Sequence, residues 1–141
     1  MDPIAPTGPV TAHAATRAIE AATGRARELG VLVSVAVVDG GGNLKAFLRM
    51  DGAEIAGPAL AVDMAYTAVA VRTATHELAA FTQPGQPLFG LHTGAGGRLT
   101  IYGGGVPIVA GDEVVGGVGV SGSAEVEHDV ACAAAGAAAV S

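Results

Sequence analysis

The sequence predicts a single α/β domain of the α+β type, with five β-strands in an antiparallel sheet. Three observations predict it: a valine-rich hairpin over residues 34–50, three further short apolar segments between residues 99 and 121, and two long helical patterns flanking the hairpin. A chain of 141 residues forms one domain that buries about two thirds of the surface its unfolded form exposes. No second domain is expected.

Charge and composition exclude several classes of protein. The net charge is −6 and the seven Lys and Arg residues are scattered singly, so neither nucleic acid nor an anionic membrane is expected as a partner. No apolar run approaches the ~18 residues of a membrane span, which predicts a soluble chain. Because small residues dominate the apolar composition, we interpret part of that surface as buried between subunits of a homo-oligomer.

The single cysteine and the start of the chain indicate in which cellular compartment the protein is expected. Cys132 alone excludes an intramolecular disulfide and every Cys-x-x-Cys motif. Residues 1–10 contain three prolines and neither the basic nor the hydrophobic region of a signal peptide. We therefore expect a flexible lead-in over 1–10, a domain over 11–141 and a cytoplasmic location.

The hairpin is the segment around which the fold is predicted to form. Residues 34–38 are a buried strand, residues 39–43 are five turn-forming residues, and residues 44–50 are the return strand. Alternation places two sets of side chains on opposite faces of that strand. The expected core face carries Leu44, Ala46, Leu48 and Met50, and the other face carries Lys45, Phe47 and Arg49.

Two helical segments hold the acidic candidates. The helix beginning at Gly57-Pro58 is apolar almost all round, so Asp63 within it must be paired or hydrogen-bonded. Asp63 shares a face with Tyr66 and Thr67, and these residues form either a structural network or the polar wall of a ligand pocket. The last helix, over residues 125–140, begins with Glu125, Glu127 and Asp129, which its dipole favours there.

Histidines and glycine motifs give weaker signals. His13 lies in the first turn of a helix over residues 11–29, and His92 lies in a long glycine-rich loop; each is either a surface histidine or a ligand. His76-Glu77 lacks the second histidine of a zinc protease motif. Gly117–Gly122 matches GxGxxG, but its glycines lie inside a strand, so a nicotinamide cofactor is not expected.

Four blocks together resemble a known family. They are VSVAVVDGGGNLKAFLRMDGA, AVDMAYTAVAVRTAT, GGGVPIVAGDEVVGGVGVSG and EVEHDVACAAAGA. In order and spacing they are similar to the GlcG/HbpS family of haem-degrading-domain proteins, which includes the C-terminal domain of PduO-type proteins. The resemblance implies a central antiparallel sheet flanked by helices, an oligomer larger than a dimer, and binding or slow degradation of haem. The chain departs from the family pattern at Met64, usually lysine, and at Glu125-Val126-Glu127, where the family reads EQD.

Two functions remain open. The first is non-covalent binding of haem, with His13 or His92 as axial ligand. The second is a cofactor-independent isomerase, cyclase or hydro-lyase acting on a small anionic molecule, in which Asp63, Glu127 or His92 moves a proton.

The expected site lies at the end of the hairpin's second strand. Arg49 binds a carboxylate or propionate there, with Asp51 beside it; alternatively Arg49 pairs with Asp51 or Glu127 at a subunit contact. In the family pattern the helix with Asp63, Tyr66 and Thr67 and the start of the last helix come close to this end. The backbone N–H groups of Gly103, Gly104 and Gly105 are expected to face the ligand.

Overall fold

The computed structural model describes residues 10–140, so the expected lead-in lies outside the described residues except for Val10. The helices are α1 (Ala12–Leu29), α2 (Gly57–Ala70), α3 (Thr75–Leu78) and α4 (Val126–Ala138). The strands are β1 (Ser34–Asp39), β2 (Leu44–Arg49), β3 (Gly105–Ala110) and β4 (Glu113–Ser121). They form an antiparallel sheet in the order β2-β1-β4-β3. The predicted α+β class and the hairpin are confirmed.

The prediction of a fifth strand is wrong, because the sheet of residues 10–140 has four strands. Residues 99–102 lie against α2 and do not join the sheet. The Thr100 N–H donates to Thr67 Oγ1 at 2.9 Å, so a side chain of α2 binds the backbone group that a neighbouring strand would otherwise bind.

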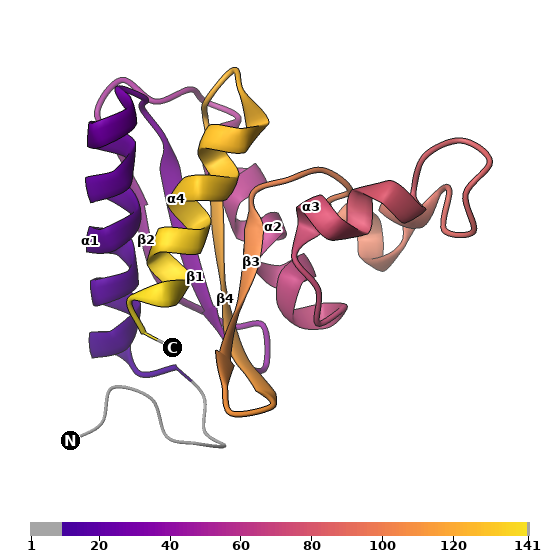
Figure 1. Ribbon diagram of the computed structural model, residues 1–141, viewed down its shortest axis with the longest axis horizontal. Helices are drawn as coiled ribbons and strands as arrows, with labels where there is room; N and C mark the ends of the chain where they lie inside the picture. The colour runs from indigo at the N-terminus through magenta and orange to yellow at the C-terminus, as the bar shows by residue number, and fades with distance from the viewer. Residues whose placement is uncertain (1–9, 141) are drawn as a thin grey trace.

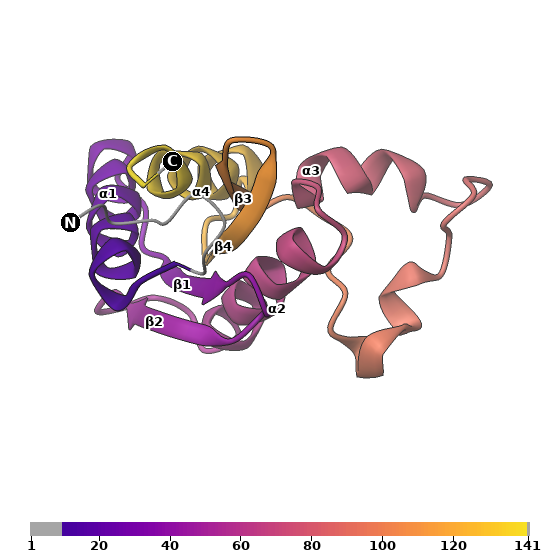
Figure 2. The ribbon, with the colours of Figure 1, turned by 90° about the horizontal axis from the view of Figure 1, so that it is seen from below.

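Helices cover both faces of the sheet. Helices α1 and α4 lie side by side on one face and α2 lies on the other (Figures 1 and 2). Strand β1 is buried on both sides: Val35 and Val37 join the core beneath α1 and α4, whereas Ala36 and Val38 contact α2. This position explains why β1 is almost continuously apolar.

Glycines in β4 allow α2 to approach the sheet closely. A side chain at Gly119 would collide with the backbone of Ala61 and Ala65, and one at Gly117 would collide with the carbonyl oxygen of Ala65. The glycines of the GxGxxG sequence therefore accommodate another backbone.

Strand β2 is an edge strand and is more exposed than predicted. Ala46 and Met50 pack against the core beneath α1 and α4, but Leu44 and Leu48 are 53% and 39% exposed. Only half of the expected core face is therefore core. A register irregularity between Val37 and Val38 pairs Leu44 with Val38, so Leu44 lies on the α2 side of the sheet and not with Ala46 and Met50.

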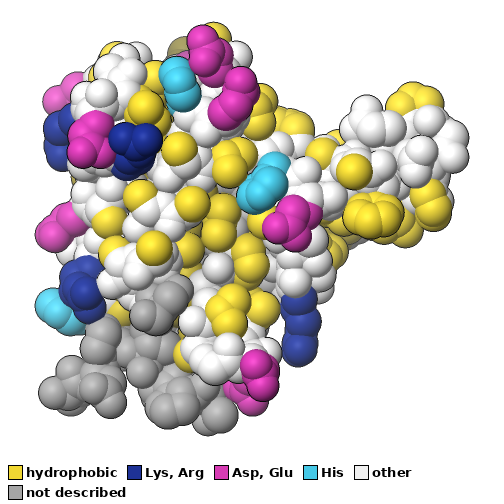
Figure 3. All heavy atoms as spheres, viewed as in Figure 1, with side chains coloured by type: hydrophobic (Ala, Val, Ile, Leu, Met, Phe, Trp, Pro, Cys, Tyr) yellow, Lys and Arg dark blue, Asp and Glu magenta, His cyan; other side chains and the backbone are white. Residues whose placement is uncertain are grey.

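A long segment projects from the sheet and its helices (Figure 1). We call residues 79–97 the arm; it contains three short 3₁₀ turns, Ala79–Phe81, Leu91–Thr93 and Ala95–Gly97. Apolar side chains cover much of its surface (Figure 3), among them the exposed Phe81, Leu88 and Phe89. Within residues 10–140, no helix has the length and apolar character needed to cross a membrane.

Candidate functional site

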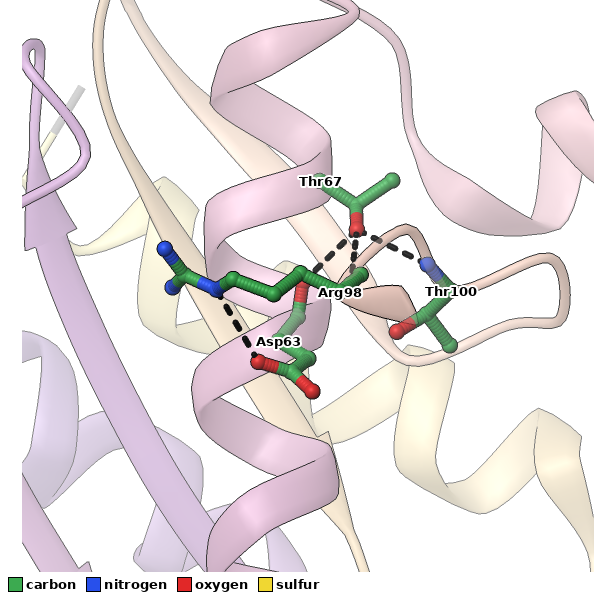
Figure 4. A network of polar contacts seen from close by, with 4 residues as sticks. All are labelled: Asp63, Thr67, Arg98 and Thr100. Carbon is green, nitrogen blue, oxygen red and sulfur yellow. Dashed lines mark hydrogen bonds and ion pairs between the residues drawn. The ribbon is translucent and has the colours of Figure 1, made fainter. Parts of the chain in front are cut away.

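Asp63 is paired with an arginine that the sequence analysis did not single out. Its Oδ1 lies 3.3 Å from Nε of Arg98 (Figure 4). The guanidinium carbon of Arg98 lies 3.7 Å from the centre of the Tyr66 ring. The Asp63 side chain is 31% exposed. Asp63 is therefore partly buried and charge-paired, and Arg98 has both an ionic and a cation–π partner on α2.

Thr67 connects the same helix to the chain that returns from the arm. Its buried hydroxyl is 2.7 Å from the Asp63 carbonyl oxygen and 3.2 Å from the Arg98 carbonyl oxygen, and it accepts the Thr100 N–H (Figure 4). Asp63 and Thr67 therefore fasten residues 98–100 onto α2. The network expected around Asp63 exists, but Thr67 contacts the backbone carbonyl of Asp63 and not its carboxylate.

Asp63 also borders two hollows, so the hydrogen-bond network around it lies at the wall of each hollow. The first hollow, of about 420 Å³, lies between α2 and β2 and is lined by Leu44, Phe47, Pro58, Ala59, Val62 and Asp63. The second, of about 390 Å³, lies between α2 and the root of the arm and is lined by Leu60, Asp63, His92, Gly97, Leu99, Thr100, Ile101 and Tyr102. Both linings are mainly apolar with a few polar groups, as ligand sites usually are.

Of the predicted residues, the structure brings Asp63 and His92 together in the second hollow. Tyr66 and Thr67 lie on α2 with Asp63 but line neither hollow. The structure does not bring in His13, which is exposed on α1, across the sheet from α2. Glu127 is exposed in the first turn of α4.

Arg49 and Asp51 lie at the end of β2, as expected, but do not pair with each other. Arg49 donates from Nε to the Ala53 carbonyl oxygen at 3.0 Å and from Nη2 to the same oxygen. Among residues 10–140, the ion pairs include neither Arg49 with Asp51 nor Arg49 with Glu127. The alternative, in which Arg49 pairs with Asp51 or Glu127 at a contact between subunits, stays a prediction, because it involves two copies of the chain.

The three successive glycines are packed against protein. A side chain at Gly103 would meet Val126 and Val130 of α4, and one at Gly104 would meet Met64. The Gly105 N–H already donates to Thr75 Oγ1 at 2.9 Å. Packing thus accounts for Gly103, Gly104 and Gly105, and the structure gives no support to their predicted role in binding a ligand. Met64 is fully buried and lines neither hollow.

Among residues 10–140, the carboxylate that is buried without an ion pair is Asp129, which the sequence analysis assigned to the helix dipole. It is 4% exposed, and its Oδ1 accepts the Ser123 N–H at 3.0 Å. Burial raises the pKa of Asp129 to about 6, against the opposing effect of backbone hydrogen bonds; nearby Glu54 raises it further. Burial also raises the pKa of Tyr102, with added repulsion from Asp129 and Glu54.

One signal in the sequence could have identified Asp129. The buried positions of α4 are Asp129, Cys132, Ala133, Gly136 and Ala137, which follow the spacing of a single helix face. Asp129 thus falls on the apolar stripe of α4, where a charged residue is uncommon. No group of three His, Cys, Asp or Glu side chains within residues 10–140 is arranged to hold a metal ion.

Comparison with known sequences finds one family and close relatives. The profile of a family described as haem-degrading, HbpS-like protein matches residues 10–138. A 15.0 kDa protein of the dhaT-dhaS intergenic region of Citrobacter freundii is 40% identical over 120 residues, which cover 85% of this chain and 84% of the relative. The corrinoid adenosyltransferase PduO of the same organism is 41% identical over 120 residues, 84% of this chain but only 35% of PduO.

A solved structure shares the fold along almost the whole chain. It is described as a crystal structure of a PduOC:heme complex and superposes with a TM-score of 0.86 at 38% sequence identity, covering 91% of this chain and 92% of that one. A similar protein of nearly the same extent has therefore been observed with haem.

Proposed function

Because the chain belongs to the family of haem-degrading, HbpS-like proteins, we propose that it binds haem, or a similar flat molecule with carboxylate groups, without a covalent bond. The resemblance noted in the sequence is thus correct. The similar PduOC structure with haem supports this ligand. The activity of PduO is not transferred, since the chain spans about a third of that protein.

The observation that carries the proposal is the pair of hollows on the two sides of Asp63. Their apolar linings suit the faces of a macrocycle, whose burial is favourable by roughly 25 cal/mol per Å². Arg98 pairs with Asp63, which borders both hollows, and its side chain is 41% exposed. Its guanidinium supplies a cation for a haem propionate.

The geometry favours His92 over His13 as the axial ligand of haem in these hollows. His92 lines the second hollow, whereas His13 lies on the opposite side of the sheet. His13 would serve a haem held at another surface, such as one shared between subunits.

Titration with haemin, followed by visible absorption, tests the function. We expect a saturable shift of the haem band, which His92→Ala changes and His13→Ala leaves intact. The reverse pattern moves the site to α1. Absence of saturable binding in the unaltered protein overturns the proposed function.

Acid–base catalysis on a small anionic molecule is the second candidate, and Asp129 favours it. Asp129 is a buried carboxyl group with a pKa of about 6, and it interacts with Tyr102, which lines the hollow of His92. NMR detection of deuterium exchange from heavy water into a panel of small carboxylic acids tests it. Exchange that Asp129→Asn abolishes supports this function, and no exchange in any acid counts against it.

A further inference from the structure

A third hollow lies away from α2, between the last turn of α1 and the end of β2. It has a volume of about 370 Å³ and is lined by Arg27, Leu48, Arg49, Met50 and Asp51. Two of its five residues are arginines, although acidic residues outnumber basic ones by 13 to 7 in the chain. This concentration of positive charge is unexpected for such a composition.

Neither arginine is neutralised by the described part of the chain. The ion pairs among residues 10–140 join Arg25 to Glu28, Arg98 to Asp63, His76 to Glu77 and His128 to Glu125. Asp51 borders the hollow but forms an ion pair with neither Arg27 nor Arg49. Two guanidinium groups beside one hollow repel each other. An anion bound between them would attract both groups and offset that repulsion.

Arg49 is held in place for such a contact. Its Nε and Nη2 both donate to the carbonyl oxygen of Ala53, a residue that is 3% exposed. Its Nη1 has no hydrogen-bond partner among residues 10–140. A guanidinium fixed on one edge loses less conformational freedom when its other edge binds a ligand.

The partial negative charge at the C-terminus of α1 should repel a bound anion only weakly. The Gly30 N–H contacts the carbonyl oxygens of Ala26 and Arg27, and the Val31 N–H donates to Ala26. These bonds occupy carbonyl groups that would otherwise present negative charge.

We propose that Arg27 and Arg49 together bind an oxyanion, a carboxylate or a phosphate, in this hollow. Both groups present paired oxygens that a guanidinium binds through two hydrogen bonds. The site does not depend on haem binding at α2. The same chemistry would fit a propionate of a bound tetrapyrrole or a free metabolite.

Isothermal titration of the full-length protein with malonate and with pyrophosphate tests the site. We expect Arg27→Gln to weaken binding of at least one of them about tenfold, since charge-assisted hydrogen bonds are lost. Arg25→Gln is the matched control: Arg25 lies on the same helix, is paired with Glu28 and does not line the hollow. It should bind as the unaltered protein does.

Arg49→Lys keeps the positive charge but removes the planar guanidinium that can form two parallel hydrogen bonds. Because Arg49 also bonds to the Ala53 carbonyl oxygen, thermal unfolding must show that this variant remains folded. It should weaken binding, and the double variant should lose less than the two single losses combined, since both residues hold one anion. Absence of binding by both probes, or equal binding by Arg27→Gln and Arg25→Gln, overturns the site.

Haemin titration of Arg27→Gln distinguishes the two sources of the anion. If malonate or pyrophosphate binding falls and haemin binding is unchanged, the hollow holds a free anion. If haemin binding falls as well, a propionate occupies it. Both results support the oxyanion site, and failure of haem binding in the unaltered protein would leave the malonate and pyrophosphate results valid.

Discussion

Arg98 Nε lies 3.3 Å from Asp63 Oδ1, although the two residues are 35 positions apart in the sequence. The pair joins the residue that directly follows the arm to the middle of α2. Because both side chains are partly exposed, solvent screens their attraction, and the pair is worth about 1 kcal/mol or less. Thr67, which is fully buried and bonds to the same segment, should contribute more.

We therefore expect Asp63→Ala to lower the free energy of unfolding by about 1 kcal/mol or less. Thr67→Val should lower it by about 1–3 kcal/mol, because it leaves the buried Thr100 N–H without its partner. Chemical denaturation of both variants measures the difference. If Asp63→Ala is the more costly change, the carboxylate is more deeply buried in solution than its 31% exposure indicates.

Replacing either of two glycines by alanine should change the stability of the protein in opposite directions. Gly119→Ala should destabilise the fold by about 1–3 kcal/mol or more, since the new methyl group meets the backbone of α2. Gly24→Ala, within α1, has open space around it and should stabilise the protein by roughly 0.5–1 kcal/mol. Thermal unfolding of the two variants gives the answer, and a tolerated Gly119→Ala would show that α2 lies farther from β4.

Stability should fall as the pH rises through the titration of Asp129. Its pKa of about 6 in the folded state is above the ordinary 3.8, so the folded state binds the proton more tightly than the unfolded state. The stabilisation is complete below about pH 4 and is lost as the pH rises through about 6. The difference between the two pKa values corresponds to ~3 kcal/mol.

Urea denaturation between pH 4 and pH 8 measures this effect. Asp129→Asn should be less dependent on pH than the unaltered protein and more stable above pH 6. Glu127→Gln, an exposed neighbour, is the control and should keep the original dependence. Identical pH profiles for all three proteins would mean that the Asp129 carboxyl group is solvated. Glu54, Tyr102 and His128 also act on Asp129, so its midpoint will shift if they are changed.

Short-range patterns in the sequence predicted the elements well. Thr11 caps α1 through the Ala14 N–H, Gly30 ends it with φ of 72°, and residues 39–43 turn the hairpin. Each of these features depends on neighbours within a few residues. Alternation also placed Ala46 and Met50 correctly. It could not show the register irregularity that moves Leu44 to the α2 side of the sheet, nor the exposure of Leu48 on an edge strand.

Contacts between distant segments were beyond the sequence. Residues 99–102 have a strand-like composition, yet a single hydroxyl, that of Thr67, binds their backbone to α2. The arginine that pairs with Asp63 directly follows the projecting arm, whose path no local pattern gives. Asp129, by contrast, could have been predicted from its place on the apolar stripe of α4.

The arm provides the test of the predicted oligomer. Phe81 and Phe89 are 53% and 61% exposed on a segment that projects from the sheet, where a monomer would leave them in water. Burying large aromatic side chains is strongly favourable, so we expect the arm to pack against another copy of the chain in an assembly larger than a dimer. Sedimentation velocity at micromolar concentration measures the size of that assembly.

Phe89→Glu should reduce the assembly to smaller species without unfolding the subunit, because Phe89 contributes to no core cluster of the described residues. Phe47→Glu is a matched control on β2: its ring is also partly exposed, but it borders the hollow beside α2 and not the arm. It should leave the assembly intact and weaken haemin binding. A stable monomer of the unaltered protein would contradict the predicted oligomer, and dissociation by Phe47→Glu alone would move the subunit contact from the arm to β2.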